Sequence, residues 1–365
     1  MGLIAIVKPT HDCNLRCKYC YLEDEAERGM MDEKTQTNTM IQVSEASGKD
    51  AHFIWHGGEP LLAGLDFFKK AATISHKLRK QNCHISNSIQ SNGTLVTEEL
   101  LDFIEQEKDF HLGFSLDGPE AVNNKTRVYA NGKGAFKDIF QGIRMAKNRK
   151  AFVGSGAIAV INKHNLPHLD KIYNFFNQER IGLKLNHIID TTAPALGISP
   201  VEYAIAMNHL FDRWIEDYQA IEIDPFSQII GNFLTGKPSG CNYSNSCQEN
   251  FISIGPRGDI YPCGRFDGLK EYRMGNINES NGLEKALKSN VRKRLKDRKL
   301  EILAICSDCK YVPICNGGCP HNALIAGDIM GKDPYCTGYR IMFKHIEDKI
   351  HQELTKAEMK GGKTQ

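Results

Sequence analysis

The sequence lacks long apolar runs, a strong excess of either charge and a secretion signal. No apolar run approaches the ~20 residues that a membrane-spanning helix requires. Basic residues number 46 and acidic residues 44, a formal net charge of +2, which indicates neither nucleic acid nor an anionic membrane as a partner. The segment Met1–Val7 has no basic residue ahead of its apolar part, unlike a secretory signal peptide. We therefore expect a cytoplasmic protein.

Cysteine, by contrast, is abundant. The 365 residues include twelve cysteines, and in a secreted chain such a number would indicate a disulfide framework. Because no secretion signal precedes them and because many are separated by only a few residues, we expect bound metal ions or iron–sulfur clusters instead. At about 100–200 residues per domain, the length allows roughly two domains.

Cys13, Cys17 and Cys20 share one short loop in the pattern C-x3-C-x2-C. Such a loop can place three thiolates around one inorganic centre but supplies no fourth ligand. A structural zinc ion would take a further Cys or His, whereas an iron–sulfur cube would take a fourth cysteine or keep one iron open. An open iron can bind and transform a small molecule, and the loop alone leaves these alternatives open.

The first half of the sequence alternates compact apolar runs with amphipathic stretches, which predicts a parallel sheet with crossover helices. The expected strands are Leu3–Lys8, His52–His56, Ile85–Gln90, His111–Leu116, Val153–Ile161 and Leu183–Ile189. The expected helices are Asp32–Glu45, Gly64–Lys80, Thr97–Gln106, Ala135–Asn148, His168–Gln178 and Pro200–Tyr218. The pattern predicts the α/β class and a partial (β/α)6 barrel, in which the site lies at the C-terminal ends of the strands.

Glycine-rich and polar segments follow the expected strands at the same edge as the cysteine loop. In the segment His56–Pro60, two glycines would let the backbone approach a ligand, and Glu59 could accept a hydrogen bond from an ammonium group. A Gly-Pro turn with a solvated Glu59 is the plainer interpretation. Gln90–Thr94 contains an Asn-Gly turn. Ser115–Pro119 is followed by Arg127, whose guanidinium is a suitable fork for a carboxylate.

Eight further cysteines lie in the second half of the chain, in the pattern C-x5-C-x15-C and, after a gap, C-x2-C-x5-C-x3-C-x16-C. They could serve two four-coordinate sites, and spacing alone does not separate iron–sulfur clusters from zinc knuckles. Phe251–Cys263 is expected to form a β-hairpin with its turn at Gly255–Gly258. Cys83 is left over, and we expect an ordinary residue near the third strand.

The C-x3-C-x2-C loop with Tyr19 between its last two cysteines, the Gly-Gly-Glu-Pro segment and the Cys315–Cys319 pattern together resemble radical S-adenosylmethionine (SAM) enzymes with a SPASM domain. The sequence is similar to anaerobic sulfatase-maturating enzymes and to radical SAM maturases of ribosomally synthesised peptides, over roughly Ile4 to Ile350. The resemblance implies a [4Fe-4S] cluster on Cys13, Cys17 and Cys20 whose open iron chelates SAM. It further implies a 5′-deoxyadenosyl radical that abstracts hydrogen from a substrate.

The resemblance also implies two auxiliary clusters and a set of SAM contacts. The first auxiliary [4Fe-4S] cluster would be held by Cys241, Cys247, Cys263 and Cys319, and the second by Cys306, Cys309, Cys315 and Cys336. The expected cofactors are therefore three [4Fe-4S] clusters and SAM. The expected SAM contacts are Tyr21, Gly57, Gly58, Glu59, Ser115, Arg127 and Leu183.

The implied domains are a radical SAM partial barrel at 1–195, a helical linker at 196–235, a SPASM domain with a β-hairpin and helices at 236–340, and a C-terminal helix with a disordered tail at 341–365. The basic run Val291–Lys299 most plainly forms a solvated helix face. An acidic leader peptide docked on that face is the other interpretation.

The expected reaction depends on the residues that follow Cys263. The sulfatase-maturating branch places an Asp directly after this cysteine, as acceptor of the substrate's thiol or hydroxyl proton. Here the position is Gly264, and Asp267 lies three residues further on. This departure favours a maturase that forms a carbon–carbon (cyclophane-type) or thioether crosslink in a ribosomally made peptide, a two-electron oxidation. Oxidation of Cys or Ser to formylglycine, with Asp267 as the candidate catalytic residue, is the alternative.

The expected partners are a peptide or protein substrate and a reducing electron donor such as flavodoxin or ferredoxin. Because the first strand begins near residue 3, we expect no N-terminal leader-binding domain, and a separate leader-binding protein could take that role. A multicluster electron carrier would explain the clusters but not the Gly-Gly-Glu-Pro segment or the open iron. A zinc-knuckle binding module would explain only the cysteines.

Overall fold

The computed structural model describes residues 2–22, 29–79, 83–149, 152, 156–189, 195–217, 220–244 and 246–361, with side chains to residue 355. The chain forms two compact units. Unit 1 comprises residues 1–159 and 246–297, and unit 2 comprises residues 160–245 and 298–365. These units divide both the predicted barrel and the predicted SPASM domain, whose boundaries stay a prediction.

Unit 1 is built on a parallel sheet. Its strands are β1 (Leu3–Thr10), β2 (Asp50–Gly57), β3 (His84–Ser91), β4 (Phe110–Ser115) and the start of β5 (Gly156–Ile161). They pair in chain order, with for example Ile6 opposite Ile54 and Phe114 opposite Ala157. Buried and less buried side chains alternate along β2 and β3, as expected when one face packs under helices.

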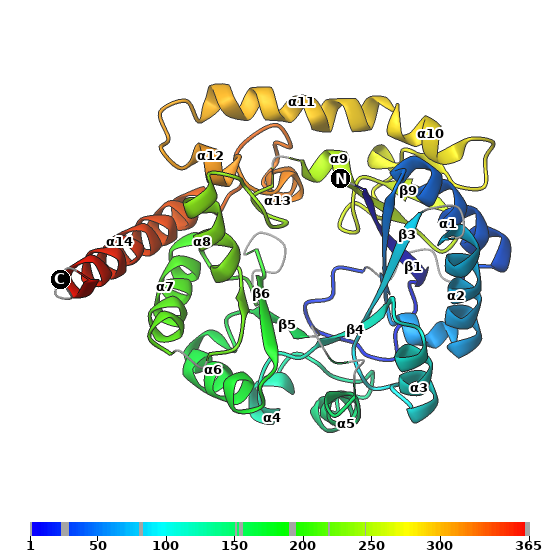
Figure 1. Ribbon diagram of the computed structural model, residues 1–365, viewed down its shortest axis with the longest axis horizontal. Coiled ribbons are helices and arrows are strands. Elements are labelled where there is room, and N and C mark those ends of the chain that lie inside the picture. The colour runs from blue at the N-terminus through cyan, green and yellow to red at the C-terminus, as the bar shows by residue number, and fades with distance from the viewer. Residues whose placement is uncertain are drawn as a thin grey trace. The chain divides into compact units, whose positions relative to one another are not determined.

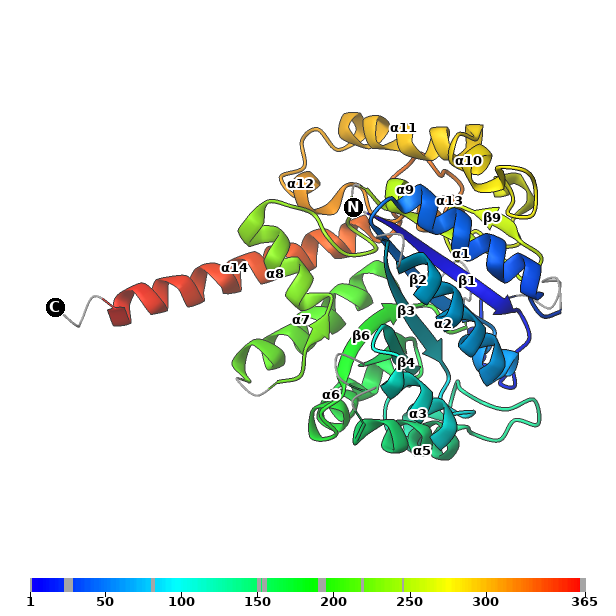
Figure 2. The same ribbon diagram turned by 45° about the vertical axis from the view of Figure 1, so that its right-hand side comes forward.

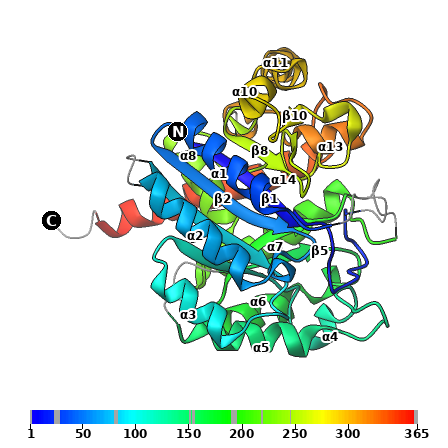
Figure 3. The same ribbon diagram turned by 90° about the vertical axis from the view of Figure 1, so that its right-hand side faces the viewer.

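Helices cover this sheet, and local residues fix where they begin. α1 (Glu33–Ser47) contacts β1 and β2, and α2 (Leu65–Arg79) contacts β3; Figures 2 and 3 show the two helices side by side. Asp32 caps α1 through the Thr35 amide. The predicted helix start at Thr97 is confirmed, since its side chain caps α3 (Glu98–Gln106). Unit 1 further includes η1 (Pro60–Ala63), α4 (Glu120–Asn123), α5 (Phe136–Lys147), α9 (Cys247–Asn250), η4 (Lys270–Tyr272) and α10 (Gly282–Leu287).

The predicted hairpin after Cys247 extends this sheet. It forms β8 (Phe251–Ile254) and β9 (Asp259–Tyr261), and β10 (Gly275–Asn276) pairs with β9. β8 pairs in parallel with β1, with Ile6 opposite Ser253. The pairing therefore brings the residues after the hairpin beside the strand that leads into the first cysteine loop.

Unit 2 contains β6 (Gly182–His187), which pairs in parallel with β7 (Ile223–Asp224). α7 (Pro200–Glu216) begins with a reciprocal capping box between Ser199 and Glu202. Figures 1 and 2 show α7 and α8 (Phe226–Thr235) beside α14 (Cys336–Gly361), which both helices contact. The further helices are η3 (Leu166–His168), α6 (Leu169–Gln178), α8 (Phe226–Thr235), α12 (Val312–Cys315), α13 (Pro320–Ile325) and α14 (Cys336–Gly361), and α11 (Asn290–Ile305) runs from unit 1 into unit 2.

The predicted strands and helices are present, with ends that differ from the prediction by up to three residues. The predicted C-terminal helix is α14. Lys80, residues 153–155, Tyr218 and the predicted tail at 362–365 lie outside the described residues. Among the residues that are described, no helix combines the length and the apolar character needed to cross a bilayer.

Candidate active site and cluster sites

Cys13, Cys17 and Cys20 lie in the loop that follows β1, and this loop is anchored by its backbone. The amides of Arg16 and Lys18 donate to the carbonyls of Val128 and Thr126, at 2.7 and 2.9 Å. These bonds hold the loop against the segment that follows β4. The sequence-predicted cysteines therefore share a fixed loop at the C-terminal end of the first strand.

The thiol groups of this loop are suited to a positively charged inorganic centre. The Leu15 amide donates to Cys13 Sγ at 3.4 Å, and the Asn92 side chain lies 3.8 Å from the same sulfur. Burial raises the pKa of the Cys13 thiol, and it raises that of Cys17 to about 12. Thiolates in this environment need a bound cation to remain deprotonated at neutral pH. The loop thus fits the implied cluster.

Gly57 and Gly58 lie so close to the backbone before Cys13 that a side chain at either position would clash with it. Gly57 has φ +117°, and a Cβ there would lie 2.4 Å from the Thr10 carbonyl oxygen. A Cβ at Gly58 would lie 2.1 Å from the Asp12 carbonyl oxygen, and the Gly58 amide donates to Thr10 at 3.0 Å. The pair therefore packs the end of β2 against the residues just before Cys13. Their contact with SAM stays a prediction.

Glu59 is buried and bonded to the neighbouring strand end, so the interpretation as a solvated residue is wrong. Its Oε1 accepts from the Ser91 hydroxyl at 2.8 Å and from the Leu61 amide at 3.0 Å. Its Oε2 accepts from the Asn92 amide at 2.7 Å. Burial raises the pKa of Glu59 to about 7, against the effect of these bonds. The carboxylate thus joins the ends of β2 and β3, and its contact with an ammonium group stays a prediction.

Asn92 is a site residue that the sequence analysis treated only as part of a turn. Its side chain donates to Asn14 Oδ1 at 2.8 Å, while its own Oδ1 accepts from the amide and hydroxyl of Thr94. Asn14 in turn donates to the Thr94 hydroxyl at 2.7 Å. The segment after β3 therefore holds the cysteine loop in place. The Asn-Gly turn was the only sequence feature that marked it.

Arg127 lies beside the cysteine loop and pairs with a buried carboxylate. Its Nε lies 3.2 Å from Asp117 Oδ1, and its guanidinium lies 5.5 Å from the centre of the Tyr19 ring. Asp117 Oδ2 accepts from the Tyr19 hydroxyl at 2.6 Å and from the Thr126 hydroxyl at 3.0 Å. The positive charge of Arg127 also opposes the effect of burial on the pKa of Cys17. Arg127 therefore stabilises the loop, whether or not it also binds the SAM carboxylate.

Replacement of Arg127 separates these two roles. Arg127→Ala should weaken SAM binding roughly tenfold to a hundredfold by removing a charge-assisted hydrogen bond. It should also destabilise the fold by ~3–5 kcal/mol, because Asp117 is left buried without its cation. Arg127→Lys keeps the charge but loses the fork, so we expect weaker SAM binding with a smaller loss in melting temperature. Calorimetric titration measures SAM binding by both variants, and thermal unfolding measures their stability. If the SAM dissociation constant is unchanged in both variants, Arg127 has only a structural role.

The remaining predicted SAM contacts have different environments. Ser115 ends β4, and its hydroxyl accepts from the Gln90 side chain at 3.1 Å. Tyr21 is 50% exposed, and the Lys8 ammonium lies 5.3 Å from its ring centre. Leu183, in unit 2, is buried near the start of β6, opposite Ile223. Since sites in parallel sheets lie at the other ends of the strands, this position favours a core role for Leu183, and its adenine contact stays a prediction.

A buried ionic group that the sequence analysis did not identify lies at the end of β1. Lys8 Nζ lies 3.0 Å from Asp267 Oδ2 and donates to the Gly264 carbonyl at 3.0 Å. His11 Nε2 lies 3.2 Å from the same Asp267 oxygen. Burial opposes ionisation of Asp267, but His11 and Lys8 hold its pKa below the usual value. Burial likewise opposes the charge of Lys8, but Tyr21 and Asp267 raise its pKa. The turn after Cys263 thus directs Asp267 towards the first cysteine loop.

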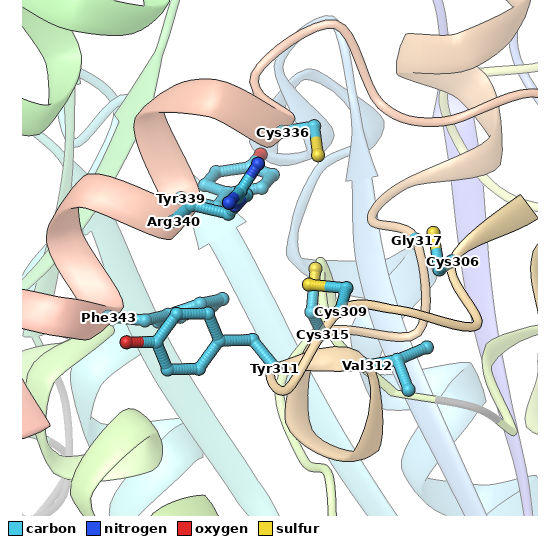
Figure 4. A pocket seen from close by; sticks show the side chains of 10 residues that line it. All are labelled: Cys306, Cys309, Tyr311, Val312, Cys315, Gly317, Cys336, Tyr339, Arg340 and Phe343. Atoms are coloured by element: carbon cyan, nitrogen blue, oxygen red, sulfur yellow. The ribbon is translucent and has the colours of Figure 1, made fainter.

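The second predicted auxiliary set surrounds a pocket in unit 2. Cys306, Cys309, Cys315 and Cys336 line it together with Tyr311, Val312, Gly317, Tyr339, Arg340 and Phe343. Figure 4 shows Cys309 and Cys315 next to each other, with Cys336 facing them from the first turn of α14. Within the described part of the chain, no three His, Cys, Asp or Glu side chains converge closely enough to hold a single metal ion. Four cysteines around one pocket are the ligand set of a [4Fe-4S] cluster or of a structural zinc ion, and the cluster stays a prediction.

The other cysteines divide between the units. Cys241 and Cys319 belong to unit 2, and Cys247 and Cys263 belong to unit 1; their assignment to one auxiliary cluster stays a prediction. Cys83 is buried, with its sulfur 3.9 Å from the Ser44 carbonyl.

Comparison with known families and proteins finds matches along nearly the whole chain. Residues 7–176 match the radical SAM superfamily, and residues 241–310 match SPASM, an iron–sulfur cluster-binding domain. The cysteine-type anaerobic sulfatase-maturating enzyme of Clostridium novyi is 31% identical over 337 residues, which cover 88% of this chain and 88% of that protein. The serine-type anaerobic sulfatase-maturating enzyme of Bacteroides thetaiotaomicron is 31% identical over 384 residues, with coverage of 94% and 89%.

A solved structure shares the fold over nearly the whole chain. It is described as native anSMEcpe with bound AdoMet and Cp18Cys peptide. The TM-score is 0.87 at 25% identity, and the match covers 98% of this chain and 100% of that one. Together with the SPASM match, it confirms the predicted fold class, an unclosed parallel α/β barrel followed by a C-terminal SPASM domain.

Proposed function

Because the chain belongs to the radical SAM enzymes with a SPASM domain, as a relative of the anaerobic sulfatase-maturating enzymes, we propose that it is a maturase that crosslinks a ribosomally made peptide. Its cofactors are SAM and iron–sulfur clusters, which we propose to be three [4Fe-4S] clusters. The proposed crosslink is a carbon–carbon bond of the cyclophane type, or else a thioether. The peptide-bound relative supports a peptide or protein segment as the substrate.

The residues of unit 1 have distinct roles in this proposal. Cys13, Cys17 and Cys20 would hold the cluster, which with bound SAM would supply a 5′-deoxyadenosyl radical. Gly57 and Gly58 bring the β2 end against the cysteine loop. Glu59 fixes that end to the end of β3. These contacts position the cluster loop at one edge of the sheet, where the backbone can also face a bound cofactor.

The observation that carries the choice of reaction is the environment of Gly264 and Asp267. A proton acceptor must come within hydrogen-bond reach of the group that it deprotonates. Gly264 has no side chain, and a Cβ there would lie 3.2 Å from Ile6 Cγ2, so a residue at this position would face an apolar side chain. Asp267 is paired with Lys8 and His11, and taking up a proton would weaken both contacts. A carbon–carbon closure needs no thiol or hydroxyl deprotonation, whereas a thioether needs loss of the thiol proton, so this environment favours the carbon–carbon crosslink.

Formylglycine formation is the second candidate function. It is favoured by the relatives, which are named as cysteine-type and serine-type sulfatase-maturating enzymes. It is also favoured by the position of Asp267, which the fold brings to the end of β1 rather than to the surface. In that reaction Asp267 would accept the proton from the substrate.

A sulfatase-type peptide separates the two functions. We expect little or no aldehyde from a Cys-x-Pro-x-Arg peptide incubated anaerobically with the reconstituted protein, SAM and dithionite. The control is 5′-deoxyadenosine formation in the same sample, which shows that the cluster is active. Abundant aldehyde that disappears in Asp267→Asn would establish the second candidate instead.

A further inference from the structure

A buried carboxylate in unit 2 binds the loop that carries cysteines of both predicted auxiliary sets. Asp333 is 1% exposed and lies between α13 and α14. Its Oδ2 accepts from the Cys319 amide at 3.0 Å, the Asn322 side chain at 2.8 Å and the Tyr339 hydroxyl at 3.3 Å. Its Oδ1 accepts from the Tyr335 amide at 2.9 Å. These four partners are all donors, so both oxygens of the carboxylate serve as acceptors.

The backbone of Asp333 contacts the second auxiliary set. Its carbonyl accepts from the Cys336 amide at 3.0 Å, and its amide donates to the Gly317 carbonyl at 2.9 Å. Gly318 has φ +75°, and a Cβ there would lie 2.3 Å from the Cβ of Asp333. The Gly-Gly pair between Cys315 and Cys319 therefore lets this loop close directly on Asp333.

A buried arginine holds the same loops through their carbonyls. The Arg298 guanidinium donates to Gly317 and Gly318, each at 3.2 Å, to Ile329 at 2.9 Å and to Gly331 at 2.8 Å. The buried cation thus holds the backbone just before Cys319 and just before Asp333. Such residues around ligand loops orient the ligands and influence the affinity for the metal.

We propose that Asp333 is a positioning residue shared by the two auxiliary clusters. Through the Cys319 amide the carboxylate fixes a ligand of the first cluster. Through the Tyr335 amide and the Tyr339 hydroxyl it fixes the residue before Cys336 and a side chain that lines the pocket of the second cluster. Loss of the carboxylate therefore destabilises both clusters together and leaves the cluster on Cys13, Cys17 and Cys20 in place. The inference rests on the proposed assignment of the eight cysteines to two clusters.

The test measures iron and cluster spectra in the full, anaerobically reconstituted chain. In Asp333→Ala we expect about one third of the wild-type iron, since one of three cubes remains. In Asp333→Asn one amide oxygen replaces the two accepting oxygens of the carboxylate. Both auxiliary clusters should still assemble, but they should release iron to a chelator about 10–100-fold faster than in the wild type. Neutralising the buried anion should also shift both auxiliary midpoint potentials upward. Asp328→Asn is the matched control, because Asp328 is exposed and bonds its own loop.

The outcome for each auxiliary cluster decides the proposal. Coupled acceleration of iron release from both clusters in Asp333→Asn, with the SAM-binding cluster signal unchanged, supports it. Acceleration for one auxiliary cluster alone, or for neither, overturns it, even if Asp333→Ala fails to fold. If the wild-type protein binds iron for fewer than three [4Fe-4S] clusters, the assignment of the eight cysteines to two clusters is wrong, and the proposal fails with it. The products formed from the peptide are measured separately, so the crosslinking proposal can fail while this one stands.

Discussion

Substituting Cys17 by alanine is expected to abolish formation of 5′-deoxyadenosine while the protein keeps about two thirds of its iron. Cys17 is one of three cysteines in the loop after β1, and no fourth cysteine lies in that loop to replace it. The two proposed auxiliary clusters have four cysteines each and should persist. Chromatography of the products of SAM and dithionite, together with iron analysis, measures both effects.

Cys83→Ala is the matched control for this variant. Cys83 is a cysteine outside all three sets, buried near the Ser44 carbonyl, and its removal should change neither iron content nor SAM cleavage. If Cys17→Ala cleaves SAM at the wild-type rate, the open cluster is not in this loop. Loss of all iron would instead show that the auxiliary sites depend on the first one.

Substituting Gly58 by alanine should have nearly as large an effect. The added Cβ would lie 2.1 Å from the Asp12 carbonyl oxygen, and that atom belongs to backbone and cannot rotate away. The residues just before Cys13 must therefore shift, which should cost the open cluster its geometry and reduce 5′-deoxyadenosine formation by two orders of magnitude or more, ~3 kcal/mol in the barrier. The assay of SAM cleavage and the spectrum of the reduced cluster report the change.

Gly231→Ala is the control for a glycine in open space, since among the described residues no heavy atom outside its own helix backbone and chain neighbours lies within 4 Å of an added Cβ. It lies in α8, where alanine is the better helix former by up to about 1 kcal/mol, so activity should be kept and stability should not fall. Normal SAM cleavage by Gly58→Ala would show that the glycine pair is not needed to position the cysteine loop.

The sequence predicted most of unit 1 because its signals are local. Compact apolar runs predicted β1 to β4, and the predicted helix start at Thr97 is where α3 is capped. The resemblance to SPASM domains implied the set that includes Cys309 and Cys315, and these cysteines line one pocket. In each of these cases, residues close in the chain carry the information.

The parts that sequence reasoning missed depend on contacts between distant segments. β8 pairs with β1 although about 240 residues separate them, and no turn residue marks a parallel pairing. The ion pair of Lys8 with Asp267 follows from that pairing. The direction of the turn after Cys263 could not be derived, so Asp267 remained an isolated candidate. Lys8 was assigned only to a strand, because alternation in an apolar run does not reveal what a polar side chain contacts.

Tandem mass spectrometry of the peptide encoded beside the gene, after anaerobic turnover with SAM, tests the proposed function most directly. We predict a product lighter by two hydrogens, with fragment ions missing across a new ring and no reaction with a hydrazide reagent for aldehydes. The fragment ions are decisive, because conversion of Ser to formylglycine also removes two hydrogens. A linear product that carries an aldehyde and reacts with the hydrazide would contradict the account.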